Sequence, residues 1–279
     1  MSIEQAFNDM VKNSEVANPI KDGDYIGENG LWYCGNCKTP KQTEVKVMGK
    51  VYRPFCTCDC EEQKNKEEEQ EQEQRKFEEK VKELRRVGFP DKEMLQWTFA
   101  NDDMENEQIT KAMKRYVENF PELKKQGKGL LLYGSVGRGK TYSACEVANA
   151  LIDKGYSVLV TNFSRVLNTL QSTFEKQEYI DSLNEFALLV IDDLGIERST
   201  EFAKEQVYNI IDSRYRAGLP MIVTTNLSID KIKNPEDIEN GRIYDRIIEK
   251  CFPIEVKGQN RRHKAVRESY GDMKELLGL

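Results

Sequence analysis

A glycine-rich segment between an apolar run and a helical pattern most constrains how this chain folds. It covers residues 134–141, follows the apolar run 129–133 and precedes the helix-compatible stretch 142–151. The glycines let successive backbone N–H groups point at one anion, and the helix that begins there adds the positive end of its dipole. A glycine turn followed by a chance Lys-Thr is the alternative, but the complete G-x-x-x-x-G-K-T pattern in this setting favours a phosphate-binding loop.

The side chains of this loop predict how a nucleotide is held. The Lys140 ammonium is expected to reach the β- and γ-phosphates, and the Thr141 hydroxyl is expected to hold Mg²⁺. The other candidate cofactor-binding positions of the segment are Gly134, Ser135, Val136, Gly137, Arg138, Gly139 and Tyr142. ATP and Mg²⁺ are therefore the predicted ligands.

Two later apolar runs end in polar residues that suit the activation of water. The run 187–191 is followed by Asp192 and Asp193, and the run 221–225 is followed by Asn226. We expect Asp192 to hold Mg²⁺ and Asp193 to polarise the water that attacks the γ-phosphate. Asn226 would orient the same water. The alternatives are that the two acids cap a helix and that the asparagine belongs to a simple turn. A helix cap at the two acids would leave Mg²⁺ without a carboxylate to hold it.

A helical segment close to the C-terminus carries Arg242 and Arg246, one turn apart. An arginine placed against the γ-phosphate of a neighbouring subunit would stabilise transition-state charge and couple hydrolysis to assembly. Arginines on helices are usually solvated, and the residues alone do not choose between these two. Arg261 and Arg262, just past the last predicted strand, would reach the phosphates of their own subunit.

Apolar runs alternate with helical patterns from residue 88 onward. The predicted strands are 129–133, 157–161, 187–191, 221–225 and 252–256. This alternation is typical of an α/β fold with a parallel sheet covered by helices on both faces. Phosphate ligands bind at the carboxyl ends of such strands, which is where the glycine loop lies.

The N-terminal part has a different character, because five of the seven cysteines fall between positions 34 and 60. Two short predicted strands around residues 49–50, with cysteines at either end, predict a zinc ribbon. The single histidine is distant, at position 263, so the Zn²⁺ ligands would be four of the five thiolates of Cys34, Cys37, Cys56, Cys58 and Cys60. We favour Cys58 and Cys60 over Cys56 as the closing pair. A redox C-x-x-C of thioredoxin type is disfavoured because no βαβ pattern surrounds it.

Charged side chains dominate the stretch that follows, with 18 in the 26 residues 61–86. Pairs with the acid first, such as Glu62 with Lys66, favour an exposed helix that serves as a spacer. The expected organisation is a zinc-binding domain at 1–60, a charged helical linker at 61–88 and a nucleotide-binding domain at 89–279.

Composition limits the partners and the location. A formal net charge of −6 argues against a protein that coats nucleic acid, so contact with DNA would need a local basic surface. The longest apolar run, 187–191, is far shorter than the ~20 residues of a membrane helix. The N-terminus has no apolar segment of a secretory signal. We therefore expect a cytoplasmic protein with no membrane partner.

In chain order, these motifs resemble those of the AAA+ ATPases of the DnaC/DnaI helicase-loader and IstB group. Between residues 99 and 267, the resemblance is carried by Gly-Leu-Leu-Leu-Tyr-Gly-Ser-Val-Gly-Arg-Gly-Lys-Thr, Val-Ile-Asp-Asp-Leu-Gly, Thr-Thr-Asn-Leu, Arg-Ile-Tyr-Asp-Arg-Ile and Gly-Gln-Asn-Arg-Arg. It implies an ASCE P-loop sheet without a lid domain, preceded by a zinc-binding region that interacts with the helicase. The Asp-Asp-Leu-Gly ending is the most specific piece, because most AAA+ proteins have Glu where this chain has Asp193.

The resemblance also implies roles for individual residues. Arg246 matches the trans-acting arginine finger, and Arg262 matches the sensor-2 arginine. Residues 163–178 would be the helical insertion that contacts single-stranded DNA, with Arg165 and Lys176 as basic candidates. Two departures are Arg138, where the group has a small residue or Thr, and Tyr142, where His is common.

The implied function is that of an ATP-dependent loader of a replicative hexameric DNA helicase, of bacterial or phage type, which forms a homo-oligomer on binding ATP. The shorter carboxylate of Asp193 predicts slow hydrolysis. The alternatives are an IstB-like transposition helper ATPase and a nucleotide-gated scaffold with little hydrolysis. A small-molecule kinase is disfavoured, because Asp192, Asp193 and Asn226 suit water activation and no acceptor-binding lid is visible.

Overall fold

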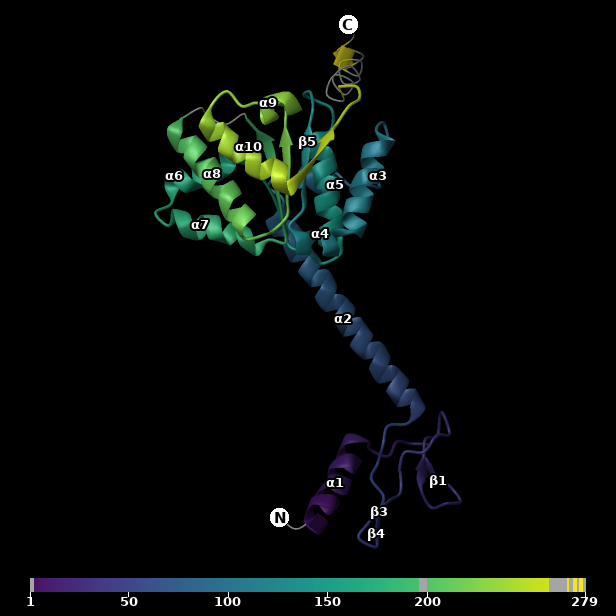
Figure 1. Cartoon of the computed structure of the whole chain (residues 1–279). Coiled ribbons are helices and arrows are strands. Elements are labelled where there is room, and N and C mark those ends of the chain that lie inside the picture. The colour runs from purple at the N-terminus through teal and green to yellow at the C-terminus, as the bar shows by residue number, and fades with distance from the viewer. Residues whose placement is uncertain (1–2, 196–199, 261–269, 271–272, 275, 278–279) are drawn as a thin grey trace. The chain divides into compact units, whose positions relative to one another are not determined.

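The computed structural model describes residues 3–195, 200–260, 270, 273–274 and 276–277. The chain divides into two compact units, unit 1 at Met1–Glu78 and unit 2 at Glu79–Leu279. Unit 1 contains the cysteine-rich region, and unit 2 contains the large sheet (Figure 1). Among the described helices, none combines the length and the apolar character that a membrane crossing requires.

Before the charged helix begins, the described residues of unit 1 form one helix and two small antiparallel strand pairs. Its elements are α1 (Ile3–Ala17), β1 (Tyr25–Ile26), β2 (Trp32–Tyr33), β3 (Val45–Val47) and β4 (Lys50–Tyr52). The α1 side chain Phe7 packs on Tyr52 of β4, with 5.2 Å between the ring centroids. The expected N-terminal helix and the hairpin around Gly49 are therefore confirmed.

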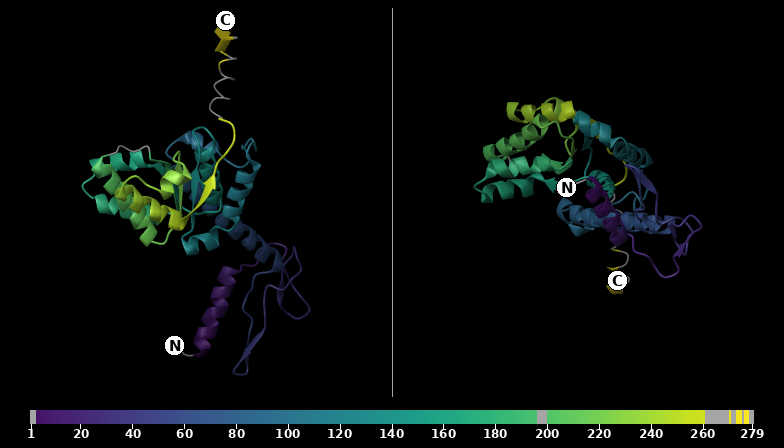
Figure 2. Two further views of the ribbon diagram at one scale, coloured as in Figure 1. Left: turned by 45° about the horizontal axis from the view of Figure 1, so that its top comes forward. Right: turned by 90° about the horizontal axis from the view of Figure 1, so that it is seen from below.

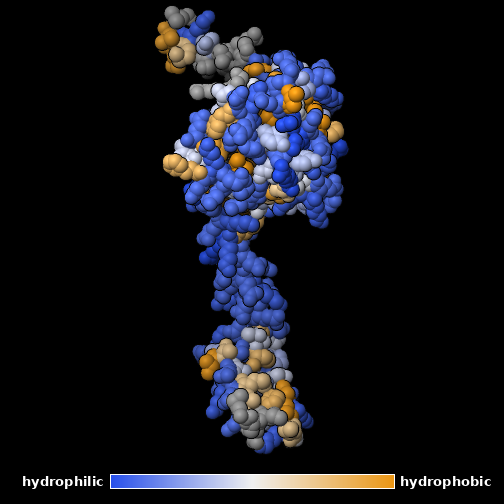
Figure 3. Space-filling view, turned by 60° about the vertical axis from the view of Figure 1, so that its left-hand side comes forward, coloured by the Kyte–Doolittle hydropathy of each residue, from blue (hydrophilic) through white to orange (hydrophobic). Residues whose placement is uncertain are grey.

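The predicted charged helix is also confirmed, as α2 (Asp59–Gly88). The face of this helix that Figure 3 shows is largely hydrophilic, and ion pairs at i,i+4 such as Lys66 with Glu62 (2.6 Å) support the helix. The C-terminal end of this helix is part of a packed core and not only a spacer. Val81 and Leu84 pack against the core of unit 2, and Gly88 is buried. The last turns of the expected linker thus belong to unit 2.

Unit 2 continues after α2 with a succession of strands and helices. Its elements are η1 (Lys92–Gln96), α3 (Glu107–Glu118), α4 (Phe120–Gln126), β5 (Gly129–Tyr133), α5 (Lys140–Asp153), β6 (Val158–Asn162), α6 (Phe163–Ser172), α7 (Lys176–Ser182), η2 (Leu183–Glu185), β7 (Leu188–Leu194), α8 (Glu201–Arg216), β8 (Met221–Thr225), α9 (Ile229–Lys233), α10 (Ile238–Lys250) and β9 (Cys251–Glu255).

The five strands form one parallel sheet in the order β6-β7-β8-β5-β9. All five predicted strands are confirmed, although β7 extends past its predicted end to include Asp192 and Asp193. Because β8 lies between β5 and β7, Asn226, which follows β8, emerges between the glycine loop and the two acids. The order of the strands therefore gathers the predicted polar residues at one edge of the sheet.

Alternation along each strand sends side chains to two cores. Leu130 and Leu132 of β5 belong to a core that includes α3 and α5, whereas Leu131 belongs to a second core that includes α6, α8 and α10. Helices accordingly cover both faces of the sheet (Figures 1 and 2). The fold is the α/β class predicted from the sequence.

A fully buried arginine beside this second core binds main-chain oxygens from several segments of unit 2. Arg214 of α8 donates to main-chain oxygens of four residues, at distances of 2.8–3.3 Å: Leu183, Phe186, Ala187 and Pro220. Burial lowers the pKa of Arg214 to about 10, so the side chain remains charged at neutral pH. It fixes the segments that enter β7 and β8, and thereby helps to set where those strands end.

Candidate functional site

The glycine loop joins β5 to α5 in a conformation that requires glycine. Gly134 (φ 142°), Gly137 (φ 78°) and Gly139 (φ 92°) all have positive φ. A Cβ on Gly134 would lie 2.7 Å from the Val256 carbonyl oxygen. Gly139 is the N-cap residue of α5, so the loop leads directly into a helix N-terminus. This backbone is suited to bind phosphate.

Lys140 occupies the mouth of the loop. Its side chain is buried, and Nζ donates to the carbonyl oxygens of Gly134 (2.8 Å) and Ser135 (2.9 Å) and to Oδ1 of Asn226 (2.7 Å). The structure thus brings Lys140 and Asn226, two residues predicted for the site, into contact. Ser135 and Val136 are exposed in the loop, and Arg138 is half-buried.

Thr141 and Asp192 form the second part of the site. The Thr141 hydroxyl donates to Asp192 Oδ1 (2.9 Å) and Oδ2 (3.1 Å), and the buried Thr224 hydroxyl donates to Asp192 Oδ1. Burial raises the pKa of Asp192, and the hydrogen bond from Thr224 opposes the rise. A hydroxyl and a carboxylate in contact are a donor set that Mg²⁺ accepts, so these residues fit the ion.

Asp193 lies at an irregularity of the sheet. The register between β7 and β8 shifts between Ile191 and Leu194, and Asp193 has φ 60°, in the left-handed region. Its N–H donates to Oγ1 of Thr224 (3.0 Å), which secures this conformation. A non-glycine residue in this region costs of order 1–3 kcal/mol and persists only where its surroundings enforce it. The bulge therefore orients two adjacent acids differently.

Two residues of the site were missed from the sequence. Thr224 contacts both Asp192 and the Asp193 backbone, and its position two residues before Asn226 on a buried strand was the available signal. Asn260 lies against the loop, since a Cβ on Gly137 would be 2.1 Å from Asn260 Oδ1. Asn260 belongs to the Gly-Gln-Asn-Arg-Arg motif, but its place beside the loop was not predicted, because that place depends on how β9 pairs with β5.

The remaining predicted residues lie elsewhere or outside the described residues. The Tyr142 ring stacks on Trp97, with centroids 5.8 Å apart, so it faces the segment before α3. Arg242 is exposed on α10, and Arg246 of the same helix contacts α8. Arg262 lies outside the residues that the structure describes.

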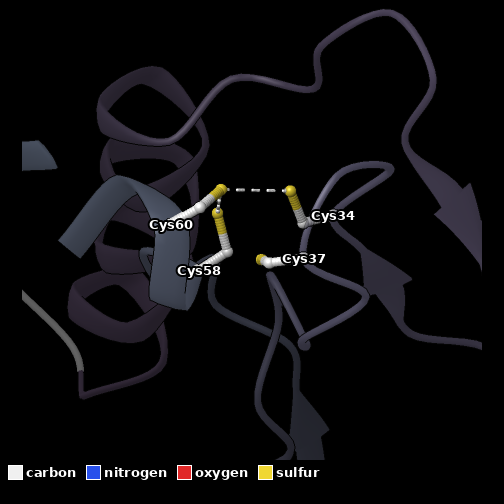
Figure 4. Close-up of side chains that lie close together, drawn as sticks. All are labelled: Cys34, Cys37, Cys58 and Cys60. Carbon is white, nitrogen blue, oxygen red and sulfur yellow. Dashed lines mark hydrogen bonds between the residues drawn. The ribbon is translucent and has the colours of Figure 1, made fainter. Parts of the chain in front are cut away.

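Unit 1 brings four sulfur atoms together. Cys34 and Cys37, after β2, face Cys58 and Cys60 at the start of α2 (Figure 4). Their Sγ atoms all lie within 4.8 Å of one another, and Cys60 Sγ is 3.6 Å from that of Cys34. Tetrahedral zinc with Zn–S bonds of about 2.3 Å requires similar spacings. The residues therefore fit a zinc ion, whereas Cys56 instead contacts the Pro40 carbonyl oxygen.

A buried ion pair supports this cysteine cluster. Lys41 Nζ lies 2.8 Å from Asp24 Oδ2, and both side chains are almost fully buried. The hydrogen bond from Lys41 lowers the pKa of Asp24 to about 2, and Asp24 Oδ1 accepts from the Gly35 N–H (2.9 Å). The Asp24 carboxylate thus holds the backbone between Cys34 and Cys37.

Comparison with known proteins identifies the family. The sequence matches the family described as IstB-like ATP binding protein over residues 59–269. The chain belongs to this family. It is 28% identical over 211 residues to the replicative helicase loader DnaI of Bacillus subtilis, covering 68% of this chain and 66% of that protein. It is 24% identical over 139 residues to the replicative helicase loader DnaC of Escherichia coli, covering 48% of this chain and 54% of that protein.

A solved structure of DnaI agrees with these sequence matches. It superposes with a TM-score of 0.53 and 27% identity, and covers 63% of this chain and 95% of that one. The chain therefore spans about half to two thirds of the two curated relatives. Its ATP-binding core is that of the helicase-loader and IstB-like ATP-binding proteins.

Proposed function

We propose that this protein is an ATP-dependent loader of a replicative DNA helicase. The observation that carries the proposal is the meeting of Lys140 with Asn226, beside Thr141 with Asp192, at the carboxyl edge of the sheet. These pairs are the groups needed to hold ATP with Mg²⁺ and to act on its γ-phosphate. The relatives that share this core, DnaI and DnaC, are named as replicative helicase loaders.

Hydrolysis follows from the same groups. The backbone N–H groups of 134–139 bind the phosphates, and Lys140 exchanges its carbonyl partners for phosphate oxygens. Thr141 and Asp192 would hold Mg²⁺, and the bound ion would neutralise charge on the phosphates. Asp193 accepts a proton from the attacking water, and Asn226 orients that water. Because Asp193 has a shorter side chain than Glu, we expect slow turnover that suits a release switch.

Assembly would bring an arginine to the γ-phosphate. Arg242 and Arg246 lie on α10, and neither makes a recorded contact with the glycine loop among the described residues. An arginine that does not serve its own subunit is suited to serve a neighbouring one. We therefore propose a homo-oligomer in which α10 contributes Arg246 in trans.

Single-stranded DNA would contact the helical pair α6 and α7. Phe174, in the turn between them, is fully exposed. Arg165 precedes it and Lys176 follows it in the sequence, and an exposed aromatic ring is suited to stack on a base. Replacing Phe174 with Ala should weaken single-stranded DNA binding about tenfold, by the loss of one stacked base. A binding titration with labelled oligonucleotides measures this, and Phe174→Tyr should retain affinity.

Unit 1 would bind the helicase, with zinc as a structural ion. Four thiolates close the coordination shell of zinc and leave no position for a substrate, so its role is to fix the fold of the unit. Exposed apolar side chains, among them Val16, Ile26 and Met48, offer a surface for a protein partner.

The test is to weigh complexes with candidate hexameric helicases, with and without ATP and Mg²⁺. A loader should form a defined complex with its helicase, and Lys140→Ala should abolish both nucleotide binding and helicase loading while zinc content is unchanged. A Lys140→Ala protein that loads the helicase as the wild type does would refute the proposal.

A transposition helper ATPase is the second candidate, favoured by the family to which the chain belongs. The cysteine cluster of unit 1 lies outside the matched residues, apart from Cys60, and we take it as the part that selects the partner. Affinity capture with a replicative helicase or a transposase as bait separates the candidates. If the protein bound to the transposase bait and not to the helicase bait, the proposed function would be that of a transposition helper ATPase.

A further inference from the structure

The Arg246 side chain is held at several points by α8. Its Nε donates to Asp212 Oδ1 (2.6 Å), and its Nη2 donates to the Tyr208 hydroxyl oxygen (2.8 Å). Its Nη1 donates to the Arg242 carbonyl oxygen (3.3 Å) within α10. The guanidinium carbon lies 4.7 Å from the ring centroid of Tyr208 and 5.7 Å from that of Tyr215. Three hydrogen bonds and two aromatic rings thus define one orientation of this arginine.

The Asp212 carboxylate is itself fixed. Its side chain is only 10% exposed, and its second oxygen, Oδ2, lies 2.7 Å from Arg216 Nη2. Both oxygens are therefore engaged by arginines from two helices. A buried carboxylate with two such partners has little freedom to move. Asp212 is a rigid support and not a mobile counter-ion.

The support leaves part of Arg246 available. A guanidinium carries five N–H groups, and the three bonds to described residues leave one N–H on Nη1 and one on Nη2. The side chain is also 25% exposed. Each terminal nitrogen therefore keeps one N–H that can donate to a phosphate oxygen.

We infer that Asp212 and Tyr208 are positioning residues that orient Arg246 for the γ-phosphate of a neighbouring subunit. This inference rests on the proposed function, in which Arg246 acts in trans. A free arginine side chain would have to be ordered at each catalytic encounter, at a cost in rotamer entropy. Here the two α8 side chains set that order before assembly, so the charge is preorganised toward the site where it is needed.

Tyr208→Phe tests the inference with the loss of one hydroxyl. In the assembled protein with ATP, Mg²⁺ and single-stranded DNA, we expect kcat to fall about tenfold, within the range for a weakened transition-state contact, with KM and thermal stability unchanged. Tyr215→Phe is the matched control. It keeps the aromatic ring that lies near Arg246 and removes only a hydroxyl that donates to Glu249 Oε1 (2.8 Å), so turnover should stay at the wild-type level.

Subunit mixing separates positioning from a purely structural role. A Lys140→Ala subunit cannot hydrolyse ATP, but it can still offer a correctly held Arg246 to its neighbour. Adding it to Tyr208→Phe subunits should therefore restore turnover at their intact nucleotide sites. In addition, Tyr208→Phe combined with Arg246→Ala should be no slower than Arg246→Ala alone, because both changes act through one group.

The outcomes distinguish this inference from the function on which it rests. A wild-type protein that hydrolyses ATP normally, with Tyr208→Phe equally active, would overturn the inference alone. Failure of Lys140→Ala subunits to restore Tyr208→Phe, or a further loss in the double variant, would assign Tyr208 a structural role and overturn it as well. A wild-type protein without ATP hydrolysis in the presence of DNA and helicase would overturn the proposed function, and the inference with it.

Discussion

Unit 1 and unit 2 differ in what fills their interiors. The buried residues among the described ones of unit 1 are Cys34, Lys41, Pro54 and Cys58, together with the buried Asp24 carboxylate. Unit 2 has two apolar cores, one on each face of its sheet. About sixty residues without an apolar core rarely fold unaided, so unit 1 depends on its cysteine cluster and one ion pair. We therefore propose that unit 2 folds first and then binds its ligand, whereas in unit 1 a bound metal would complete the fold.

The largest effect should follow from removing one zinc ligand. Cys58→Ser, in the full-length protein, should abolish metal binding and expose the backbone amides of residues 19–58, because a structural zinc supplies much of the folding free energy of so small a unit. Elemental analysis and hydrogen exchange read by mass spectrometry measure both effects. Cys56→Ser is the control and should retain zinc and protection, since Cys56 lies outside the cluster. If both variants kept zinc and protection, or both lost them, unit 1 would not depend on the four-cysteine cluster in the way that sets it apart from unit 2.

A smaller effect is expected from the interior of unit 2. Arg214→Met leaves the main-chain oxygens of four residues without their charged donor, and should lower the free energy of unfolding of unit 2 by about 3–5 kcal/mol. Denaturant unfolding with zinc present measures it. Arg216→Lys, two residues along α8 and 73% exposed, keeps a positive charge beside Asp212 and should cost less than about 1 kcal/mol. Comparable losses in both variants would contradict the structural role of Arg214.

The smallest effect concerns the site itself. Thr224→Val removes the hydroxyl that joins Asp192 to the Asp193 backbone, and should reduce Mg²⁺-dependent hydrolysis about tenfold and stability by about 1–2 kcal/mol. Thr225→Val is matched to it, since the Thr225 hydroxyl donates instead to the Leu194 carbonyl oxygen. Thr225→Val should lower the free energy of unfolding by a similar amount but leave the rate of hydrolysis nearly unchanged. Steady-state phosphate release distinguishes them, and an equal loss of activity would show that stability alone explains the result.

The sequence predicted the fold well because its signals are local. The five strands of unit 2 were identified from apolar runs, and the glycine loop from one pattern whose spacing is fixed by phosphate geometry. The charged helix was predicted for the same reason, since its i,i+4 pairs are neighbours in sequence. What was missed there is the packing of Val81 and Leu84 on the core, which depends on a partner far along the chain.

The finer details of the site depended on tertiary contacts. Asp193 has a left-handed conformation at the register shift between β7 and β8. No residue type in the Asp-Asp-Leu-Gly stretch predicts such a bulge. Thr224 could have been suspected from its place on β8, but its partner could not. The attachment of Arg246 to Asp212 and Tyr208 joins two helices, α8 and α10, that are separated in sequence by β8 and α9, and periodicity does not reveal it.

Calorimetry of the full-length protein tests the central claim most directly, namely that unit 1 is completed by a metal and unit 2 binds ATP with Mg²⁺ through Lys140. The account predicts two unfolding transitions. A chelator should remove the transition that belongs to unit 1. ATP with Mg²⁺, at an ATP concentration of a hundred times Kd, should raise the free energy of unfolding of unit 2 by about 2.7 kcal/mol. Lys140→Ala should abolish that rise. A unit 2 transition that does not respond to ATP, or that responds equally in Lys140→Ala, would contradict the account.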